Sequence, residues 1–386
     1  MFFRKIRCSA TRICAALAAA LTTASCGLVS DTPGLELGVI LPLSGEYAHY
    51  GKETLRGMNV AVDLLNSERK PAGLPEIKLH VIDTESVPYR ALAGYKKLVN
   101  KGFPLVIGPG PTDETRLLIH GVNDSEVPLL MPIASGDNIT ARGNSIYRVC
   151  ITDGFQAQML VDYMRSELGI SELAVMMNLQ KDASYGRNLA QAVSNRFKKA
   201  GGRVIITESF RDGAKSFSDQ LVRIISRNPQ AIFIPASAAS SARFVREARL
   251  MGYDGWIVGS DSMAEPDFLN YLDGTSGKVL FTSNYSPDDD TPGNRRMREA
   301  FRERSLGEPG DCEALGFDAI LIAAAALERG ETFAEGWKNC AGLELVCGPL
   351  TFSSGNAVNR PVYLNIPVFD NESGKTVITN VRSQQQ

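Results

Sequence analysis

Short apolar runs alternate with longer amphipathic segments along most of this chain. Leu35–Leu41 and Ile77–Ile82 have the length and composition of buried strands, and Thr54–Asn66 between them places apolar residues at helical spacing. The same alternation continues through residues 89–131 and starts again near residue 156. Such a series of βαβ units predicts parallel sheets with helices on both faces. The 386 residues have room for about two domains of this kind.

The alternation divides into two series, which predicts two similar α/β lobes. The last third of the chain has too few elements for a third sheet, so we expect them to return to the two lobes. We assign residues 35–148 and 282–346 to lobe 1, and residues 149–281 and 347–380 to lobe 2. A chain that crosses between lobes more than once forms a hinge of limited freedom, which favours clamshell closure.

The first 25 residues predict an export signal. A basic start is followed by the apolar stretch Ile13–Leu21 and by small residues just before Cys26. The small residues and the cysteine resemble a bacterial lipobox, in which Cys26 carries the lipid. The alternative is an ordinary signal peptide cut after a small residue, with no role for Cys26. We expect a periplasmic protein held at a membrane through Cys26, with residues 26–34 as a polar tether.

Charge and cysteine content limit the partners. Beyond the leader the chain has 37 Lys and Arg residues against 43 Asp and Glu residues, which argues against a nucleic-acid partner. Outside the cytoplasm disulfides persist, and Cys340 and Cys347 are close enough in sequence to close a short loop, contributing about 2–3 kcal/mol. Cys150 and Cys312 are expected as buried thiols, with a disulfide between them as the alternative.

The sequence contains none of the common catalytic motifs. GxSxG, HExxH and GxxxxGK[ST] are all absent, and the three histidines have no metal-ligand spacing. We therefore expect no enzymatic activity, no cofactor and no metal. A hydrolase of periplasmic peptides remains the enzymatic alternative.

Several segments together carry a family resemblance. The longest is Leu37–Lys52 (LGVILPLSGEYAHYGK). The others follow in the order Val106–Thr112, Leu130–Ser135, Tyr147–Gln156, Asp182–Gly186, Val258–Asp261, Ala314–Ala319 and Gly348–Phe352. In these the chain resembles the Leu/Ile/Val-binding family of type I periplasmic binding proteins, over nearly the whole mature length. The resemblance implies two Rossmann-like lobes with parallel central sheets, joined by a hinge of several crossovers.

The resemblance also implies a binding site for an amino acid. Thr112 and Ser135 would receive the α-carboxylate and Asp261 the α-ammonium. Tyr50 and Tyr185 would form aromatic walls, and Ile133 an apolar one. Read without the family, Thr112 is equally an N-cap of the helix that follows it, Ser135 a turn residue and Asp261 an ordinary loop acid. In the stretch 233–241, only small side chains follow Phe233 and Ile234, where the family commonly presents an aromatic residue to the ligand, which leaves the ligand open.

The function implied by the resemblance is solute capture. The chain would hold an amino acid or related small molecule between its lobes and deliver it to the permease of an ABC transporter, acting as a monomer. The alternative within the same fold is an envelope lipoprotein that senses a ligand or regulates a partner without transport.

Overall fold

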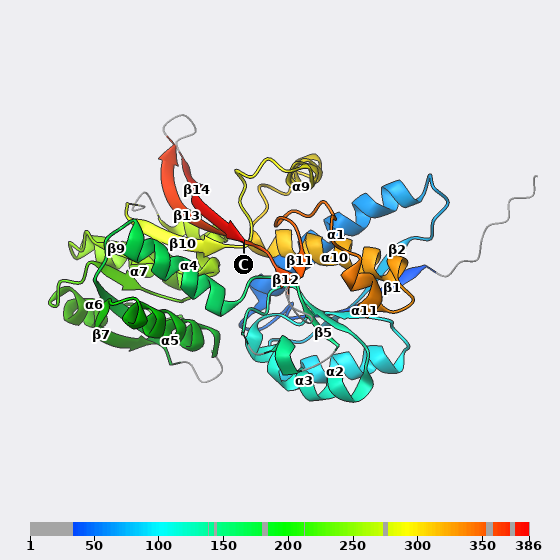
Figure 1. Cartoon of the computed structure of the whole chain (residues 1–386), viewed down its shortest axis with the longest axis horizontal. Helices are drawn as coiled ribbons and strands as arrows, with labels where there is room; N and C mark the ends of the chain where they lie inside the picture. Colours follow the sequence, from blue (N-terminus) through cyan, green and yellow to red (C-terminus); the bar gives the residue numbers. More distant parts are fainter. Residues whose placement is uncertain are drawn as a thin grey trace, which may run out of the picture. The chain divides into compact units, whose positions relative to one another are not determined.

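The computed structural model describes residues 34–385 apart from 138, 143–144, 180–183, 212, 273–276, 353–357 and 371–374. The predicted signal segment and Cys26 lie outside the described residues. Within these ranges the alternating strands and helices build two large sheets (Figure 1). None of the helices in the same ranges has both the length and the apolar character that crossing a bilayer requires.

The first sheet is parallel and has the strand order β2-β1-β3-β4-β5. Leu37 and Val39 of β1 pack into a core shared with α1 and α10, whereas Ile40 packs on the opposite face with α2 and α3. This burial on both faces explains why β1 is a continuous apolar run. The elements are β1 (Leu35–Leu41), α1 (Ala48–Arg69), β2 (Ile77–Asp83), α2 (Pro88–Asn100), β3 (Val106–Ile107), α3 (Thr112–Ser125), β4 (Leu129–Met131), η1 (Thr140–Arg142) and β5 (Ile146–Arg148). We call this sheet and the helices packed on it the first lobe.

The second sheet has the order β14-β13-β10-β9-β8-β6-β7 and is parallel from β10 to β7. Helices α4 and α5 contribute to the core on one face, and α6, α7 and α8 to the core on the other. The elements are α4 (Asp153–Ser166), β6 (Glu172–Asn178), α5 (Ser184–Lys199), β7 (Arg203–Phe210), α6 (Ser218–Ile225), β8 (Ala231–Phe233), α7 (Ala238–Leu250), β9 (Trp256–Val258), η2 (Asp261–Ala264), α8 (Pro266–Leu272), β10 (Val279–Ser283), β13 (Pro361–Asp370) and β14 (Lys375–Gln385). We call this sheet with its helices the second lobe.

The chain passes from the first lobe to the second after β5, returns after β10, and passes over again between α11 and β13. The returning elements are α9 (Pro292–Glu303), α10 (Asp311–Arg329) and α11 (Phe333–Lys338), and β11 (Thr351–Phe352) pairs with β12 (Val358–Asn359) in the last passage. The predicted fold class, two α/β lobes joined by several crossovers, is confirmed. Val149, Cys150, Cys347 and Leu350 still pack in the first-lobe core, slightly past the expected boundaries at 148 and 346.

The carboxyl-terminal edge of the second sheet differs from a purely parallel expectation. β13 runs antiparallel to β10, and β14, which was not predicted, runs antiparallel to β13. The sequence of β14 alternates only weakly, and Val377 remains 40% exposed, so its apolar signal is small. β14 also extends the lobe to Gln385, beyond the expected end at 380.

The predicted disulfide between Cys340 and Cys347 is wrong. The thiol of Cys340 points to the carbonyls of Ile322 and Gly336, at 3.8 and 3.3 Å, whereas that of Cys347 lies against Asp318. The two thiols are thus directed to different acceptors, and both are free and buried. Cys150 and Cys312 are also free and buried.

Two glycines let α1 and α10 approach closely. A Cβ on Gly316 would lie 2.2 Å from the Thr54 carbonyl oxygen, and one on Gly57 would lie 2.0 Å from that of Glu313. Alanine in an open helix would stabilise by about 1 kcal/mol. We expect Gly316→Ala instead to destabilise by about 3 kcal/mol, because the helices must separate. Urea unfolding measures this loss.

Gly277→Ala is the control for that substitution, because its added Cβ meets no atom within 4 Å. It should change the unfolding free energy by no more than about 0.5 kcal/mol. Equal effects of the two substitutions would contradict the close packing of α1 on α10.

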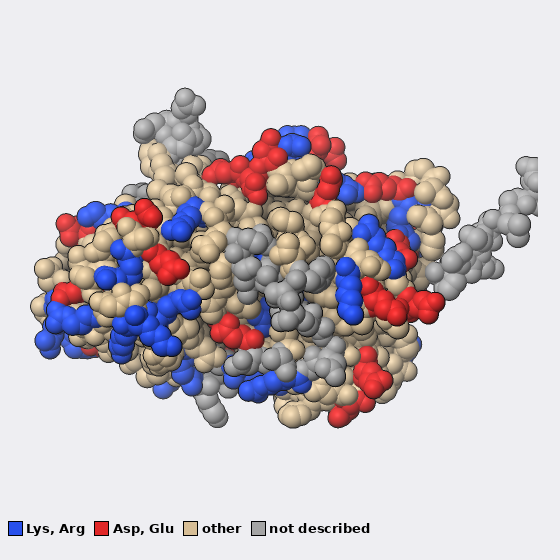
Figure 2. Space-filling model, in the orientation of Figure 1, with Lys and Arg blue, Asp and Glu red and all other residues tan. Residues whose placement is uncertain are grey.

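On the face shown in Figure 2, charged side chains of both signs cover the surface. Lys and Arg gather around α5 and β7, and Asp and Glu around α9. The last turn of α5 contributes Arg196, Lys198 and Lys199 to the basic group. This face is therefore mixed in charge, in contrast to the cavity described next.

Candidate functional site

A cavity of about 450 Å³ is lined by both lobes. Its wall is made by segments that follow the carboxyl ends of β1, β3 and β4 in the first lobe and of β6, β8 and β9 in the second. Open α/β sheets bind their ligands at this edge. The structure brings all six residues singled out in the sequence to this one cavity: Tyr50, Thr112, Ile133, Ser135, Tyr185 and Asp261.

The first lobe contributes two hydroxyl groups. Thr112 is the first residue of α3 rather than its N-cap, because Pro111 occupies the cap position. The Thr112 Oγ1 accepts a hydrogen bond from the backbone N–H of Gly136 at 3.0 Å, in the loop that carries Ser135. The start of α3 is therefore joined to the loop after β4. First-turn N–H groups and hydroxyls in one place suit an anionic group.

A buried arginine lies behind this loop. Arg148, at the end of β5, is 1% exposed. Its guanidinium donates to the Ser135 carbonyl at 2.9 Å and also to the carbonyl of Gly136. The sequence reasoning missed Arg148 as a site residue, although an almost fully buried arginine is itself unusual. Its positive charge favours a carboxylate nearby, and the buried carboxyl group of Asp153, which hydrogen-bonds with Ser135, already interacts with it.

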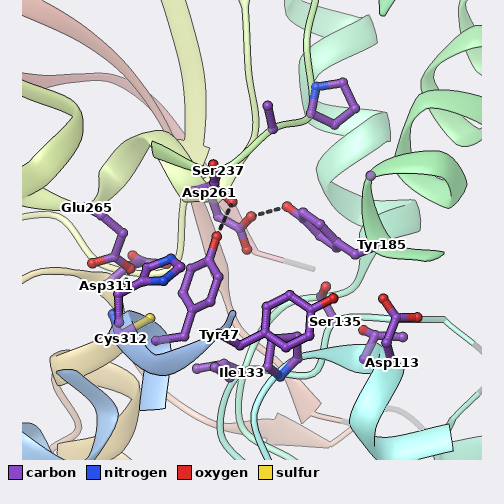
Figure 3. A pocket seen from close by; sticks show the side chains of 18 of the residues that line it. Tyr47, Asp113, Ile133, Ser135, Tyr185, Ser237, Asp261, Glu265, Asp311 and Cys312 are labelled. Atoms are coloured by element: carbon purple, nitrogen blue, oxygen red, sulfur yellow. Dashed lines mark hydrogen bonds between the residues drawn. The ribbon is translucent and has the colours of Figure 1, made fainter. Parts of the chain in front are cut away.

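Asp261 is held by two side chains of the second lobe, of which Figure 3 shows that of Tyr185. Its Oδ1 accepts a hydrogen bond from the Tyr185 hydroxyl, and its Oδ2 accepts one from Gln156 Nε2 at 3.2 Å. Gln156 is oriented in turn by Thr282, whose hydroxyl donates to Gln156 Oε1 at 2.7 Å. Burial raises the pKa of Asp261 despite these hydrogen bonds. A cation beside Asp261 would offset that burial.

The two lobes also meet at the cavity wall. The Tyr50 hydroxyl, from α1, donates to Ser262 Oγ of η2 at 3.4 Å. The small residues Pro235, Ala236 and Ser237 line the second-lobe side, in the stretch where the sequence lacks an aromatic residue. Small side chains therefore form this part of the wall, because the stretch presents no aromatic side chain to the cavity.

Sequence reasoning missed several residues of the wall. They are Glu46, Tyr47, Asp113, Asn178, Ser262, Glu265, Asp311 and Cys312. Glu265 follows Asp261 by one helical turn, which was an available signal. Asp311 and Cys312 reach the cavity only because α10 returns to the first lobe, and no local pattern predicts that.

One end of the cavity is rich in carboxyl groups. Both oxygens of Asp311 are engaged, by the backbone N–H groups of Asn284 and Tyr285 and by the Asn284 side chain. Glu313 accepts from Gly310 N at 2.8 Å and pairs with Arg56. Glu265 accepts from Cys312 N at 3.3 Å through one oxygen only. Burial raises the pKa of Asp311 to about 8 and that of Glu265 well above its ordinary value.

Glu53 of α1 should make the stability of the empty protein depend on pH. Burial raises its pKa from 4.5 to about 7; Glu313 and Asp267 also raise it, whereas its hydrogen bond with Glu265 and the charge of Arg56 lower it. The folded state then holds a proton that the unfolded chain releases above pH 4.5. Stability should fall as pH rises from about 4.5 through 7, by up to about 1.4 kcal/mol per pH unit.

Urea unfolding at several pH values measures this dependence. Glu53→Gln should reduce the slope without removing it, because burial also raises the pKa of Asp153 and that of Glu114 to about 7. A variant with the same slope as the wild type between pH 5 and 7 would show that Glu53 does not contribute to it.

Comparisons with known proteins agree with this architecture. The sequence pattern of the family described as periplasmic binding protein matches residues 34–365. Leu/Ile/Val-binding protein homolog 3 of Brucella melitensis is 23% identical over 353 residues, which cover 89% of this chain and 93% of that protein. The leucine binding protein LivK of Thermotoga maritima is 25% identical with a TM-score of 0.78, over 90% of this chain and 98% of that one.

A third protein is similar in fold alone. The solute binding protein of an ABC transporter from Rhodopseudomonas palustris, solved in complex with 3,4-dihydroxybenzoic acid, has a TM-score of 0.79 at 19% identity, over 91% of this chain and 97% of that one. A two-lobed fold, a cavity at the strand ends and a family match across most of the length coincide here. The chain therefore belongs to the periplasmic binding protein family, with the type I fold that its sequence resembles.

Proposed function

We propose that this chain captures a small amino-acid-like solute in the cavity and delivers it to the permease of an ABC transporter. The observation that carries the proposal is the division of polar groups between the lobes. Hydroxyls backed by a buried arginine come from the first lobe, and the half-buried carboxylate of Asp261 comes from the second. A zwitterion needs hydrogen-bond donors at one end and an acidic acceptor at the other.

The α-carboxylate would bind at Thr112 and Ser135, and the α-ammonium at Asp261. Tyr50 and Tyr185 would enclose the solute between their rings. Since these groups belong to different lobes, the solute meets all of them only when the lobes are closed. This differential contact is what lets a ligand shift the equilibrium between open and closed forms.

The relatives support the transport role. The Brucella relative is named for the binding of leucine, isoleucine and valine, and the Rhodopseudomonas protein is the solute binding protein of an ABC transporter. The predicted lipid on Cys26 would keep the protein near the membrane that holds its permease.

A thermal-shift panel of amino acids, amides, small peptides and aromatic acids tests the proposal. A solute at 100 times its Kd should stabilise the protein by about 2.7 kcal/mol. We expect the shift with an α-amino acid, and Ser135→Ala should reduce it. Stabilisation by aromatic acids alone, or by no member of the panel, would overturn the assignment.

A further inference from the structure

The cavity wall is more acidic than a simple zwitterion requires. Its carboxyl side chains belong to Glu46, Asp113, Asp261, Glu265 and Asp311, and no Lys or Arg occurs among its described lining residues. One acid, Asp261, is enough for an α-ammonium. The face of the molecule shown in Figure 2 carries both signs of charge, unlike this wall. An excess of carboxyl groups in an enclosed space favours a ligand with additional positive charge.

Among the acids at one end of the cavity, Glu265 has an unused acceptor atom. It is 3% exposed and lines the cavity. Its Oε1 accepts from Cys312 N, but no N–H or O–H group of the described residues donates to its Oε2. Asp311 is different, since both of its oxygens are already bonded. A buried carboxylate oxygen without a donor is costly unless a cation or a proton reaches it.

Glu53 adds a second carboxyl group beside that of Glu265. Its Oε2 also lacks a donor, and its carboxyl group lies close enough to that of Glu265 to share a proton. The acceptor atoms of Glu53 and Glu265 and the sulfur of Cys312 all lie within 4.8 Å of one another. Glu53 belongs to the first lobe and Glu265 to the second, so a cation here would join the lobes at a second place.

Glu265 lies where the side chain of a bound amino acid would end. Figure 3 shows Glu265, Asp311 and Cys312 together at one end, Ser135 and Asp113 at the other, and Asp261 between them. A solute with its carboxylate at Ser135 and its α-ammonium at Asp261 would therefore extend its side chain toward Glu265.

We infer that the Glu265 end of the cavity binds a cationic group on the side chain of the solute. The preferred class is then an α-amino acid with an ammonium or guanidinium side chain, rather than a branched aliphatic one. This inference rests on the proposed function, because it takes the α-carboxylate and α-ammonium to bind as described above. The cation replaces the proton shared by Glu53 and Glu265, and that proton passes to solvent.

Isothermal titration with two matched pairs tests the inference: lysine against norleucine, and arginine against citrulline. A hydrogen bond to a charged group contributes about 1.5–3 kcal/mol, so the wild type should bind at least one cationic member about 10- to 100-fold more tightly than its neutral partner. Glu265→Gln should remove this preference while changing the affinity for the neutral member no more than about threefold.

Two controls keep the result interpretable. Glu303→Gln alters an exposed acid on α9 and should leave the preference unchanged. Retained binding of norleucine or citrulline shows that Glu265→Gln has folded. Glu53→Gln, which acts through Glu265, should reduce the preference less than Glu265→Gln does.

The outcomes separate the two proposals. If the wild type binds norleucine and citrulline as tightly as their cationic partners or more tightly, and this binding depends on Asp261, the preference for a cationic side chain is overturned. The proposal of solute capture would still stand. Binding of no amino acid would overturn both. A third outcome would assign the Glu265 end of the cavity to an inorganic cation instead. In that case Zn²⁺ or Ca²⁺ would stabilise the wild type, EDTA would reverse the effect and Glu265→Gln would remove it, while neither amino-acid pair would show a preference for its cationic member.

Discussion

Asp261→Asn is expected to weaken the binding of an α-amino acid by about 100-fold or more. The substitution keeps the shape of the side chain but removes the negative charge that would face the α-ammonium. Removing one partner of a buried, hydrogen-bonded charge pair costs about 2–5 kcal/mol, which corresponds to roughly 30- to several-thousand-fold in Kd. Isothermal titration measures the change directly.

The empty variant should remain folded, because relief of the disfavoured charge offsets the loss of the acceptor for Gln156 Nε2. Burial raises the pKa of Asp261, so its charge is disfavoured there when no cation is bound. An amide oxygen can still accept the hydrogen bond from Tyr185. Asp254→Asn, an exposed acid in the same lobe, is the matched control and should leave affinity unchanged. Undiminished binding by a folded Asp261→Asn variant would exclude Asp261 as the ammonium acceptor.

Asp318→Ala should destabilise the protein by about 3–5 kcal/mol. Asp318 and Arg360 form an ion pair at 2.6 Å, with side chains 0% and 1% exposed. Asp318 also accepts from the backbone N–H groups of Val346 and Cys347, at 2.8 and 3.0 Å. Without the carboxylate the guanidinium stays buried and unpaired, which carries this cost.

The pair stabilises the passages between the lobes. Arg360 donates to the carbonyls of Gly348 and Val149, at 3.0 and 3.4 Å, and Val149 follows directly after β5. Burial alone would lower the pKa of Arg360, but the charge of Asp318 outweighs it and raises that pKa. Arg360 therefore keeps its charge at any ordinary pH.

Urea unfolding compares Asp318→Ala with a surface control. Arg298 and Glu308 also form an ion pair, at 3.2 Å, but their side chains are 43% and 75% exposed. Glu308→Ala should cost no more than about 1 kcal/mol, because water solvates both charges. Similar losses in the two variants would show that Asp318 and Arg360 do not hold the crossovers together.

Much of the fold could be predicted from apolar patterning. β1 and β9 have the bounds expected from their sequences, because a buried parallel strand is a short, uninterrupted apolar run. α1 begins at Ala48, six residues before the expected Thr54, because the polar residues of its first turns give no periodic signal. β14 was missed because its half-exposed edge position requires little apolar sequence.

The site residues that could be predicted are those in segments that resemble the family. Those outside such segments could not. Thr112, Ser135 and Asp261 belong to segments whose sequences resemble the family, and the structure brings them to one cavity. Arg148 was missed because its role depends on the loop carbonyls that it contacts. Glu265 lies outside these segments, and its importance comes from an oxygen to which no N–H or O–H group of the described residues donates.

The disulfide prediction failed for a similar reason. Short separation in sequence allows Cys340 and Cys347 to meet, but it does not determine where each thiol points. In the fold one thiol faces the carbonyls of α10 and α11 and the other faces Asp318. Orientation of that kind is set by tertiary packing.

The crystal structure of the protein with the amino acid that it binds most tightly would test the central claim most directly. We predict a solute inside the cavity, with its carboxylate in hydrogen-bond contact with Ser135 and Thr112 and its α-ammonium in contact with Asp261. Both lobes would then contact the solute. A solute outside the cavity, or one that contacts a single lobe, would contradict capture between the lobes.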